Sequence, residues 1–274
     1  MTKTWLVTGA SRGLGLSITK KILNKGDHVI ATVRRKGSLQ LTHPNLTILY
    51  LDMTDSDSIN SAVEIAFKSK VDIVIGNAGY GLFGAAEELE DHEINKQILT
   101  NLTGAMALIR SVIPYFRAQD GGKFIQISSE GGQISYPGFS AYHASKWGIE
   151  GFIEAVAQEV NDFKIQMMIV EPGPTKTDFA ISAVQSKVNP VYETTPVGQV
   201  RKAFKDIKTG NKNGIFESLS DVDKSVETII LAAEQDRIPL RLALGHSTYR
   251  NIHMALSKRL FDLEQNKNIS LLAD

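Results

Sequence analysis

A serine, a tyrosine and a lysine with complementary chemistry occur in one short segment, ISSEGGQISYPGFSAYHASKWG (127–148). Tyr142 and Lys146 are four residues apart in a helical pattern, which places both side chains on one face of the helix. Ser129 follows an apolar run that predicts a strand, so its hydroxyl would face the same crevice. A tyrosine with its usual pKa near ~10 works at neutral pH only when a cation such as Lys146 stabilises the phenolate. These residue types indicate carbonyl reduction, although Tyr-x-x-x-Lys spacing alone is as often chance.

Carbonyl reduction also needs a hydride source, and a glycine-rich segment near the start of the chain is suited to hold one. TGASRGLG (8–15) lies between the apolar run TWLV and a predicted helix. Gly9, Gly13 and Gly15 allow a sharp turn, and the free N–H groups at the start of the helix suit a phosphate. The spacing is a variant of the dinucleotide fingerprint, and a tight turn before a helix explains it nearly as well. Its position after the first strand favours the phosphate site.

The end of the second predicted strand, ATVRRK (31–36), indicates which dinucleotide would bind. An acidic residue here commonly selects the ribose 2′-hydroxyl of NAD, whereas arginine accommodates the 2′-phosphate of NADP. This strand has no acid at its end, and Arg12, Arg34 and Arg35 could clamp a phosphate dianion with their guanidinium groups. A solvated basic turn is an equal alternative for Arg35 or Lys36 alone. We therefore predict NADP(H) as the cofactor.

Two further loops follow strands of the same predicted sheet. Asp52, after the third strand, could accept a hydrogen bond from an adenine amino group or could equally be a local cap. The turn GNAG (76–79) supplies Asn77, Ala78 and Gly79 where the ribose of the cofactor would pass. Because ligands bind at the carboxyl ends of parallel strands, we expect these loops to line one crevice.

Short apolar runs and longer helical patterns must position these loops. The runs lie at 4–8, 28–33, 46–51, 71–76, 123–128, 165–170 and 240–245, and the helical patterns lie at 14–24, from 55 on, and at about 91–118, 139–162, 220–234 and 247–265. Strands that are apolar on both faces and alternate with helices predict a doubly wound α/β fold. We expect one domain over residues 1–274, with an irregular insert at about 174–215 that contains a short helix. Such an insert is expected to be a substrate lid, with a tolerated surface excursion as the alternative.

Composition argues against several classes of function. Thirty basic and thirty acidic side chains leave no net charge that would attract nucleic acid or an anionic membrane. The chain has no cysteine, and its six histidines show no pair at metal-ligand spacing, so no metal site is expected. The apolar stretch in MTKTWLVTGAS is too short for a signal peptide, so we expect none, and no apolar run approaches the ~18 residues of a spanning helix. We expect a soluble, cytoplasmic protein.

The glycine loop, the NAG turn, Ser129, the Tyr142–Lys146 pair and PGPTKT (172–177), in this order, resemble the short-chain dehydrogenase/reductase superfamily over residues 4 to about 178. The resemblance implies a Rossmann-type three-layer sandwich with seven parallel strands, the last being LRLALG. It implies that Tyr142 is the catalytic acid/base and that Ser129 orients the carbonyl, since the spacing to Tyr142 favours it over Ser128. Lys146 would hold the nicotinamide ribose and lower the tyrosine pKa. Asn101 would hold a water in a proton relay that ends at Lys146.

The resemblance and the loops described above together give the predicted cofactor contacts. PGPTKT would touch the nicotinamide amide, with Thr175 and Thr177 as contacts. The full set is Gly9, Ser11, Arg12, Gly13, Leu14, Gly15, Arg34, Arg35, Asp52, Met53, Asn77, Ala78, Gly79, Tyr142, Lys146, Pro172, Gly173, Thr175 and Thr177. The segment 241–264 and the long insert are more weakly similar to the 17β-hydroxysteroid and retinol dehydrogenase-like branch. That similarity suggests an apolar alcohol or ketone.

We expect the substrate pocket beside Tyr142 to be apolar and walled by Leu82, Phe83, Tyr136, Phe139, Phe179 and Tyr192. Burial of a ring or alkyl chain against such walls stabilises binding by roughly 25 cal/mol per Å². The leading hypothesis is an NADPH-dependent reductase of a hydrophobic ketone or aldehyde, reversible as an alcohol dehydrogenase. The alternatives are an epimerase or dehydratase with the same fold and cofactor, and a regulator that binds NADPH without chemistry. The resemblance also implies a homodimer or homotetramer, with the helices at about 91–118 and 139–162 at its interface.

Overall fold

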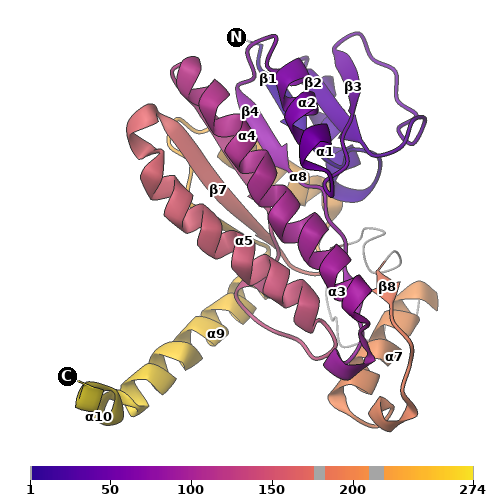
Figure 1. Ribbon diagram of the computed structural model, residues 1–274, viewed down its shortest axis with the longest axis vertical. Coiled ribbons are helices and arrows are strands. Elements are labelled where there is room, and N and C mark those ends of the chain that lie inside the picture. Colours follow the sequence, from indigo (N-terminus) through magenta and orange to yellow (C-terminus); the bar gives the residue numbers. More distant parts are fainter. Residues whose placement is uncertain (1, 176–182, 210–218, 274) are drawn as a thin grey trace.

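Seven parallel strands form one sheet in the order β3-β2-β1-β4-β6-β7-β9 (Figure 1). The computed structural model describes residues 2–175, 183–209 and 219–273. The strands are β1 (Thr4–Val7), β2 (His28–Val33), β3 (Leu46–Tyr50), β4 (Ile73–Gly76), β6 (Gly122–Ile127), β7 (Ile165–Pro172) and β9 (Arg241–Leu244). The strand order reverses between β1 and β4, and such a switch point is where doubly wound sheets bind ligands. The predicted α/β fold is confirmed.

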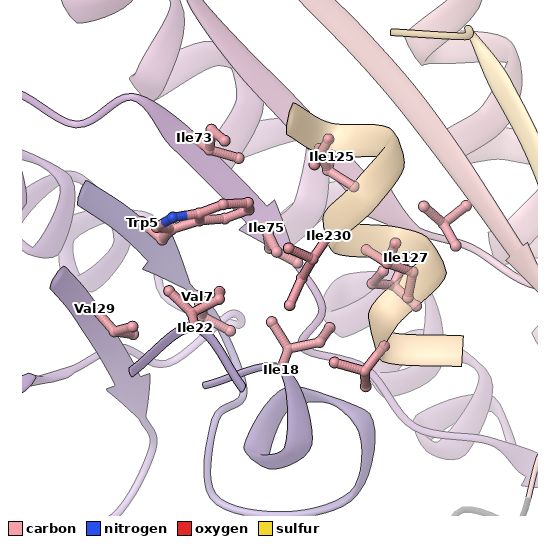
Figure 2. Close-up of a cluster of buried hydrophobic side chains, with 14 of the residues drawn as sticks. Trp5, Val7, Ile18, Ile22, Val29, Ile73, Ile75, Ile125, Ile127 and Ile230 are labelled. Atoms are coloured by element: carbon pink, nitrogen blue, oxygen red, sulfur yellow. The ribbon is translucent and has the colours of Figure 1, made fainter. Parts of the chain in front are cut away.

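Helices cover both faces of the sheet and bury one apolar cluster on each. On one face lie α1 (Gly13–Asn24) and α8 (Val222–Glu234), whose Ile18, Ile22 and Ile230 pack against strand residues such as Trp5 (Figure 2). On the other lie α2 (Ser56–Ala66), α4 (Gly104–Ala118) and α5 (Ser140–Glu159). Because both faces are covered, central strands such as β1, β2 and β4 are apolar and almost wholly buried, whereas the edge strand β3 is largely exposed.

The helix predicted at about 91–118 is divided into three parts. It consists of α3 (Asp91–Ile98), a π-helical segment (Leu99–Thr103) and α4. The backbone passes very close to the loop after β3 here, since a Cβ added at Gly104 would lie 2.1 Å from the Met53 carbonyl oxygen. A π-turn inserts an extra residue into the helical ladder, which shifts the side chains that follow onto a new face. The periodicity of the apolar residues does not reveal this interruption.

The described part of the insert is more regular than the sequence predicts. β8 (Val184–Gln185) pairs in parallel with β5 (Leu82–Phe83), a 3₁₀ turn spans Pro190–Tyr192, and α7 spans Pro196–Thr209. Val200 and Phe204 of α7 pack with Phe83, Phe139 and Tyr142 in a third apolar cluster. The short helix expected within the insert is present as α7, which buries an apolar face at helical spacing, whereas the strand β8 was not expected.

The chain ends in a helix that extends away from the sheet (Figure 1). In α9 (His246–Gln265), Thr248 and Ile252 are buried near the start, whereas Leu260, Phe261 and Leu263 are exposed. A short helix, α10 (Lys267–Ser270), and a 3₁₀ turn (Leu271–Ala273) follow. Further 3₁₀ turns lie at Ala86–Glu88, Glu130–Gly132 and Asn161–Phe163. Within the described ranges, no helix is both long enough and apolar enough to cross a membrane.

Candidate active site

A cleft of about 850 Å³ runs along the carboxyl ends of the strands and brings most of the predicted residues together. Its walls include Gly9, Ser11, Arg12, Gly13, Leu14, Arg34, Arg35, Asp52, Met53, Asn77, Ala78, Gly79, Ser129, Tyr136, Phe139, Tyr142, Lys146, Pro172, Gly173 and Thr175. Five predicted residues do not line it: Gly15, Leu82, Phe83, Asn101 and Tyr192. Thr177 and Phe179 lie outside the described residues. In the described part of the chain, no group of His, Cys, Asp or Glu side chains could hold a metal ion.

The glycine loop after β1 requires its glycines for shape. Gly9 and Gly13 have positive φ angles of +67° and +54°, which L side chains rarely adopt. A Cβ at Gly15 would lie 2.5 Å from the Gly9 carbonyl oxygen, so Gly15 supports the loop from behind. Helix α1 starts at Gly13, and no side chain caps its first turn. Its N–H groups are therefore free to bind an anion that lies in the cleft.

Hydrogen bonds tie the glycine loop to the turn after β4. The Thr8 hydroxyl accepts from the backbone N–H groups of Asn77 (2.9 Å) and Ala78 (3.1 Å). The Asn77 side-chain amide donates to the carbonyl oxygens of Thr8 (2.9 Å) and Gly9 (3.2 Å). These four bonds fix the two loops across the switch point. The Asn77 amide thus positions the loop besides lining the cleft.

The three predicted arginines line the same end of the cleft as the glycine loop, which contains Arg12 itself. Arg12, Arg34 and Arg35 all line it, and in the described part of the chain no carboxylate forms an ion pair with them. Asp52 makes local turn bonds, since its Oδ1 accepts from the N–H (2.9 Å) and hydroxyl (2.8 Å) of Thr54. These bonds, led by the backbone bond, and the charge of Arg34 lower the pKa of Asp52. The cleft therefore offers a cationic corner suited to a phosphate.

Ser129, Tyr142 and Lys146 meet at the cleft wall, as their spacing predicts. The Ser129 and Tyr142 hydroxyls are hydrogen-bonded to each other. The Lys146 Nζ lies 5.7 Å from the Tyr142 ring centroid and donates to the Ile127 carbonyl oxygen at 3.0 Å. Burial raises the pKa of Tyr142 to about 12 and lowers that of Lys146 to about 8. The expected lowering of the tyrosine pKa is thus not seen, because burial of the phenol outweighs the Ser129 hydrogen bond.

The neighbouring serine has a different role. The Ser128 hydroxyl donates to the Glu150 carboxylate at 2.5 Å. Ser129 instead accepts a hydrogen bond from the Gly131 N–H at 3.0 Å and caps the short 3₁₀ turn that follows β6. The Ser129 hydroxyl is therefore held within hydrogen-bonding distance of the Tyr142 hydroxyl. This geometry supports Ser129 over Ser128 as the group that orients a carbonyl.

Asn101 is buried in the π-helical segment, away from the cleft wall. Its Oδ1 accepts from the Tyr80 N–H (3.1 Å), and its Nδ2 donates to the Tyr80 carbonyl oxygen (2.8 Å) and to the Ser145 hydroxyl (3.4 Å). The amide therefore holds the turn after β4 against α5. Its role in a proton relay stays a prediction, since no described contact joins it to Lys146.

Comparison with known proteins decides the family of this chain. The family model described as short chain dehydrogenase matches residues 3–187. The chain belongs to the short-chain dehydrogenase family. Among its curated relatives, an oxidoreductase of Botryotinia fuckeliana is 35% identical over 253 residues and covers 89% of each chain. A 3-ketodihydrosphingosine reductase of Bacteroides thetaiotaomicron is 39% identical over 176 residues and covers 64% of each.

Solved structures share the whole fold of this short-chain dehydrogenase. A short-chain dehydrogenase from Streptomyces avermitilis has 33% identity and a TM-score of 0.89, and the match covers 100% of both chains. Two structures with lower identity carry nucleotides. One from Burkholderia cenocepacia (20% identity, TM-score 0.76, coverage 96% and 97%) is in complex with NADP, and one from Burkholderia phymatum (17%, 0.78, 97% and 95%) is in complex with NAD. The last two show likeness of fold alone.

The substrate end of the dehydrogenase cleft differs from the predicted one. Tyr136 and Phe139 line it, whereas Leu82 and Phe83 are buried behind it, and Tyr192 hydrogen-bonds Glu87 outside it. The sequence does not reveal that Leu82 and Phe83 are buried behind the cleft, because β5 is only two residues long and shows no periodicity. It does not reveal the position of Tyr192 either, because a short 3₁₀ turn carries no repeat. Residues that sequence analysis missed here are Val184, Phe204 and Leu219. Phe204 could have been found from the sequence, because Val197, Val200 and Phe204 have the apolar spacing of one helix face.

Two charged residues in the cleft also escaped sequence analysis. Lys96 of α3 lies in the wall, and its charge contributes to the lowered pKa of Asp52. Glu130, next to Ser129, is only 2% exposed. The predicted set of aromatic and apolar residues suggested a pocket wall without charged groups. The wall in fact contains Lys96 and Glu130. No sequence pattern signals this, because a glutamate after a strand is most often solvated.

Proposed function

We propose that this dehydrogenase is an NADPH-dependent carbonyl reductase that reduces hydrophobic ketones or aldehydes and can run in reverse as an alcohol dehydrogenase. The observation that carries the proposal is the continuity of one cleft. The glycine loop and the arginine corner lie at one end, and the Ser129–Tyr142 hydrogen bond lies at the other. A nucleotide and a carbonyl compound could therefore occupy the same cleft together.

The described residues fit a nicotinamide dinucleotide phosphate. Any side chain at Gly9 would meet Ala78, so the backbone there stays open to a phosphate. Arg12, Arg34 and Arg35 supply the charge that a 2′-phosphate needs, and no acid follows β2. A bound reduced nicotinamide supplies the hydride for this reaction. Pro172, Gly173 and Thr175 would hold its amide, and Lys146 its ribose.

The protein's own groups would handle the carbonyl oxygen and its proton. The Ser129 and Tyr142 hydroxyls form two adjacent hydrogen-bond donors for that oxygen. These donors would stabilise the negative charge that develops on the oxygen as the hydride adds to the carbonyl carbon. With a pKa near 12, Tyr142 keeps its proton across the neutral range and can deliver it to the developing alkoxide. The buried Lys146 ammonium stabilises the phenolate left behind. Phe139 and Phe204 in the cleft wall, backed by the buried Phe83, would exclude water and accept apolar substituents.

Relatives support an oxidoreductase that acts on a ketone, since one of them is named a 3-ketodihydrosphingosine reductase. Solved neighbours hold either NADP or NAD, so the preference for NADPH rests on the arginine corner. The alternatives of an epimerase or dehydratase, or of a regulator without chemistry, would use the same cleft. A dedicated regulator has no use for Ser129, Tyr142 and Lys146 together.

The test is NADPH and NADH oxidation with a panel of long-chain ketones, aryl ketones, aldehydes, acetone and pyruvate. We expect kcat/KM to be higher with NADPH than with NADH, and higher for the bulky apolar carbonyls than for acetone or pyruvate. Arg34→Asp should erase or invert the nucleotide preference, and the exposed Lys68→Gln serves as its control. Preference of the native enzyme for NADH would refute the cofactor proposal. Absence of net turnover with every carbonyl would favour the epimerase or dehydratase alternative.

A further inference from the structure

Glu130 occupies an unusual position for a carboxylate. It directly follows Ser129, so its Cα lies about 3.8 Å from that of the carbonyl-orienting residue. Its side chain lines the cleft and is nonetheless 2% exposed. A buried charge is costly unless a partner compensates it. The question is therefore what compensates Glu130.

The other buried glutamates of the described chain each have an arginine partner. Glu88 pairs with Arg201 at 2.7 Å, and Glu150 and Glu171 share Arg241. Glu130 has none, since among the described residues no cation forms an ion pair with it. Its described hydrogen bonds come from the Tyr136 hydroxyl and, at 3.3 Å, from the Asn251 side-chain amide of α9. Burial raises the pKa of Glu130, and within the described ranges no cation offsets the charge of its carboxylate at the cleft wall.

The loop that carries Glu130 is held rigidly. His143 of α5 accepts from the Tyr136 N–H at 2.8 Å through Nε2, which leaves Nδ1 to donate to the Gly131 carbonyl oxygen at 2.8 Å. Burial lowers the pKa of His143, so this ring is a neutral clamp and supplies no positive charge. Tyr136 and Glu130 therefore meet the cleft as a preorganised pair.

We propose that Glu130 is a specificity-determining residue that binds a protonated amine of the substrate, and that the substrates are hydrophobic ketones with an amino group close to the carbonyl, or the corresponding amino alcohols. An ionised carboxylate has about four acceptor positions, of which Tyr136 and Asn251 occupy two. A substrate ammonium fills a further position and supplies the missing countercharge. Glu130 lines the same cleft as Ser129, and its charge acts on Tyr142, so an ammonium at Glu130 would lie near a carbonyl held at those hydroxyls. The inference rests on the proposed function.

A purely structural role for Glu130 makes a different prediction. In that case the carboxylate only holds Tyr136 and α9 in place, and Gln in its position would preserve the acceptor for Tyr136 without the charge. Glu130→Gln thus separates charge from scaffold. Asn251→Ala is the matched control, because it removes a neighbouring hydrogen bond and keeps the charge.

The experiment compares three synthetic substrates of equal chain length: a long-chain 2-amino-3-ketone, its N-acetyl derivative and the unsubstituted 3-ketone. At neutral pH we expect kcat/KM for the amino ketone to be at least about tenfold higher than for the other two, as one charge-assisted hydrogen bond predicts. Glu130→Gln should reduce this ratio to near one with little change for the unsubstituted ketone. Asn251→Ala should retain the ratio. Calorimetric titration with the matching amino alcohol should show the same loss of affinity in Glu130→Gln.

The outcomes separate this inference from the proposed function. Equal kcat/KM of the native enzyme for all three compounds would overturn the amine site and leave the carbonyl reductase intact. Retention of the amine preference in Glu130→Gln, with an unchanged melting temperature, would also overturn it. No reduction of any of the three compounds or of the wider carbonyl panel would reject the proposed function itself. The comparison of the amino ketone with its N-acetyl derivative uses only the native protein, so it stands even if a variant folds poorly.

Discussion

At the scale of single residues, burial decides the protonation states at the site. The Tyr142 side chain is enclosed by the third apolar cluster and by the Ser129 hydroxyl, and its pKa of about 12 keeps the proton in place through the neutral range. Lys146 is likewise buried, and its pKa is near 8. As the pH rises, the Lys146 ammonium therefore loses its proton before the Tyr142 hydroxyl does. The tyrosine is thus poised as an acid, and the lysine sets the pH above which the site loses its cation.

Replacement of Tyr142 by Phe tests this assignment. The change removes the proton donor and keeps the ring that packs on Phe139. Because general acid catalysis contributes ~10²- to 10⁴-fold, kcat for ketone reduction should fall by about that factor. Fluorescence titration should show NADPH affinity within about twofold of native, since no predicted phosphate contact changes. Near-native turnover by this variant would disprove the role of Tyr142.

The sequence predicts the residues at this scale when their partners are close along the chain. Tyr142 and Lys146 are one helical turn apart, and Ser129 ends the preceding strand, so periodicity alone brings them together. The environment of Glu130 depends on Asn251, which is 121 residues away, and on the clamp by His143. Asn101 shows the same limit, because its partners lie on the turn after β4 and on α5. Such contacts follow from the tertiary fold and leave no local pattern.

At the scale of elements, α7 contributes a wall of the pocket, and its role as a substrate lid stays a prediction. Val200 and Phe204 pack in the aromatic cluster, and Arg201 forms a buried ion pair with Glu88. Removing residues between Ser182 and Gly210 would therefore uncover this cluster and leave Glu88 without its partner, which is strongly destabilising. A single substitution at the cleft wall is the more informative change.

Phe204→Ala should widen the substrate end of the cleft. Phe204 lines the cleft and contacts the Phe83 and Phe139 rings, with centroids 5.7 Å and 5.4 Å away. We expect KM for bulky apolar ketones to rise several-fold while NADPH affinity stays unchanged, together with a loss of stability of about 3 kcal/mol or more. Val200→Ala is the control, because Val200 belongs to the same cluster and does not line the cleft. Equal effects of both variants on KM would argue against a substrate contact by Phe204.

Three elements meet in a polar cluster around Arg241. Arg241 of β9 contacts Glu150 and Glu154 of α5 and Glu171 of β7. One guanidinium cannot neutralise three carboxylates, and burial together with the charge of Glu150 raises the pKa of Glu171 to about 7. Since the usual value for a glutamate is near 4.5, the folded protein binds this proton more tightly than the unfolded chain does. The resulting stability is present below about pH 4.5 and is lost as the pH rises through about 7.

Glu171→Gln should flatten this part of the pH dependence of stability. The amide cannot ionise, so its contribution to the free energy of unfolding should not decline between pH 4.5 and about pH 7. Urea denaturation at a series of pH values, followed by circular dichroism, measures the difference. Glu64→Gln, a change at an exposed position of α2, is the matched control. Parallel curves for Glu171→Gln and native protein would show that Glu171 ionises normally in the fold.

The sequence predicts elements well where one periodicity is maintained over many residues. The strands of the main sheet and helices such as α1, α5 and α8 lie within a few residues of their predicted positions. β5 and β8 are two residues long each, and their pairing joins segments about a hundred residues apart. The π-helical segment likewise depends on the close approach of Gly104 to the backbone of Met53. Neither feature has enough local repetition to be seen in the sequence.

At the scale of the whole molecule, two surfaces are candidates for contact between copies of the chain. The outer face of α5 carries four exposed small residues at helical spacing: Ala144, Gly148, Gly151 and Ala155. Trp147 beside them is 43% exposed. The second surface is the extended part of α9, where Leu260, Phe261 and Leu263 are exposed. Large apolar side chains exposed within one turn of a helix favour association, because monomeric proteins rarely expose large contiguous apolar patches. We predict a homodimer or homotetramer that uses the small-residue face of α5 with α4, because small residues let two helices approach closely.

Gly151→Arg tests that interface without disturbing the protomer. A Cβ at Gly151 meets no atom within 4 Å, so the new side chain has room in a single copy of the chain. Replacing a helical glycine should even favour the helix by up to ~1 kcal/mol, whereas a long cation between two closely packed helices should separate them. Light scattering at micromolar concentration should give a multiple of the 30.0 kDa protomer mass for the native protein and a lower mass for Gly151→Arg. Gly151→Ala is the control and should leave the mass unchanged. A native protein that is monomeric would contradict the assembly, and loss of association in Leu260→Glu but not in Gly151→Arg would move the interface to α9.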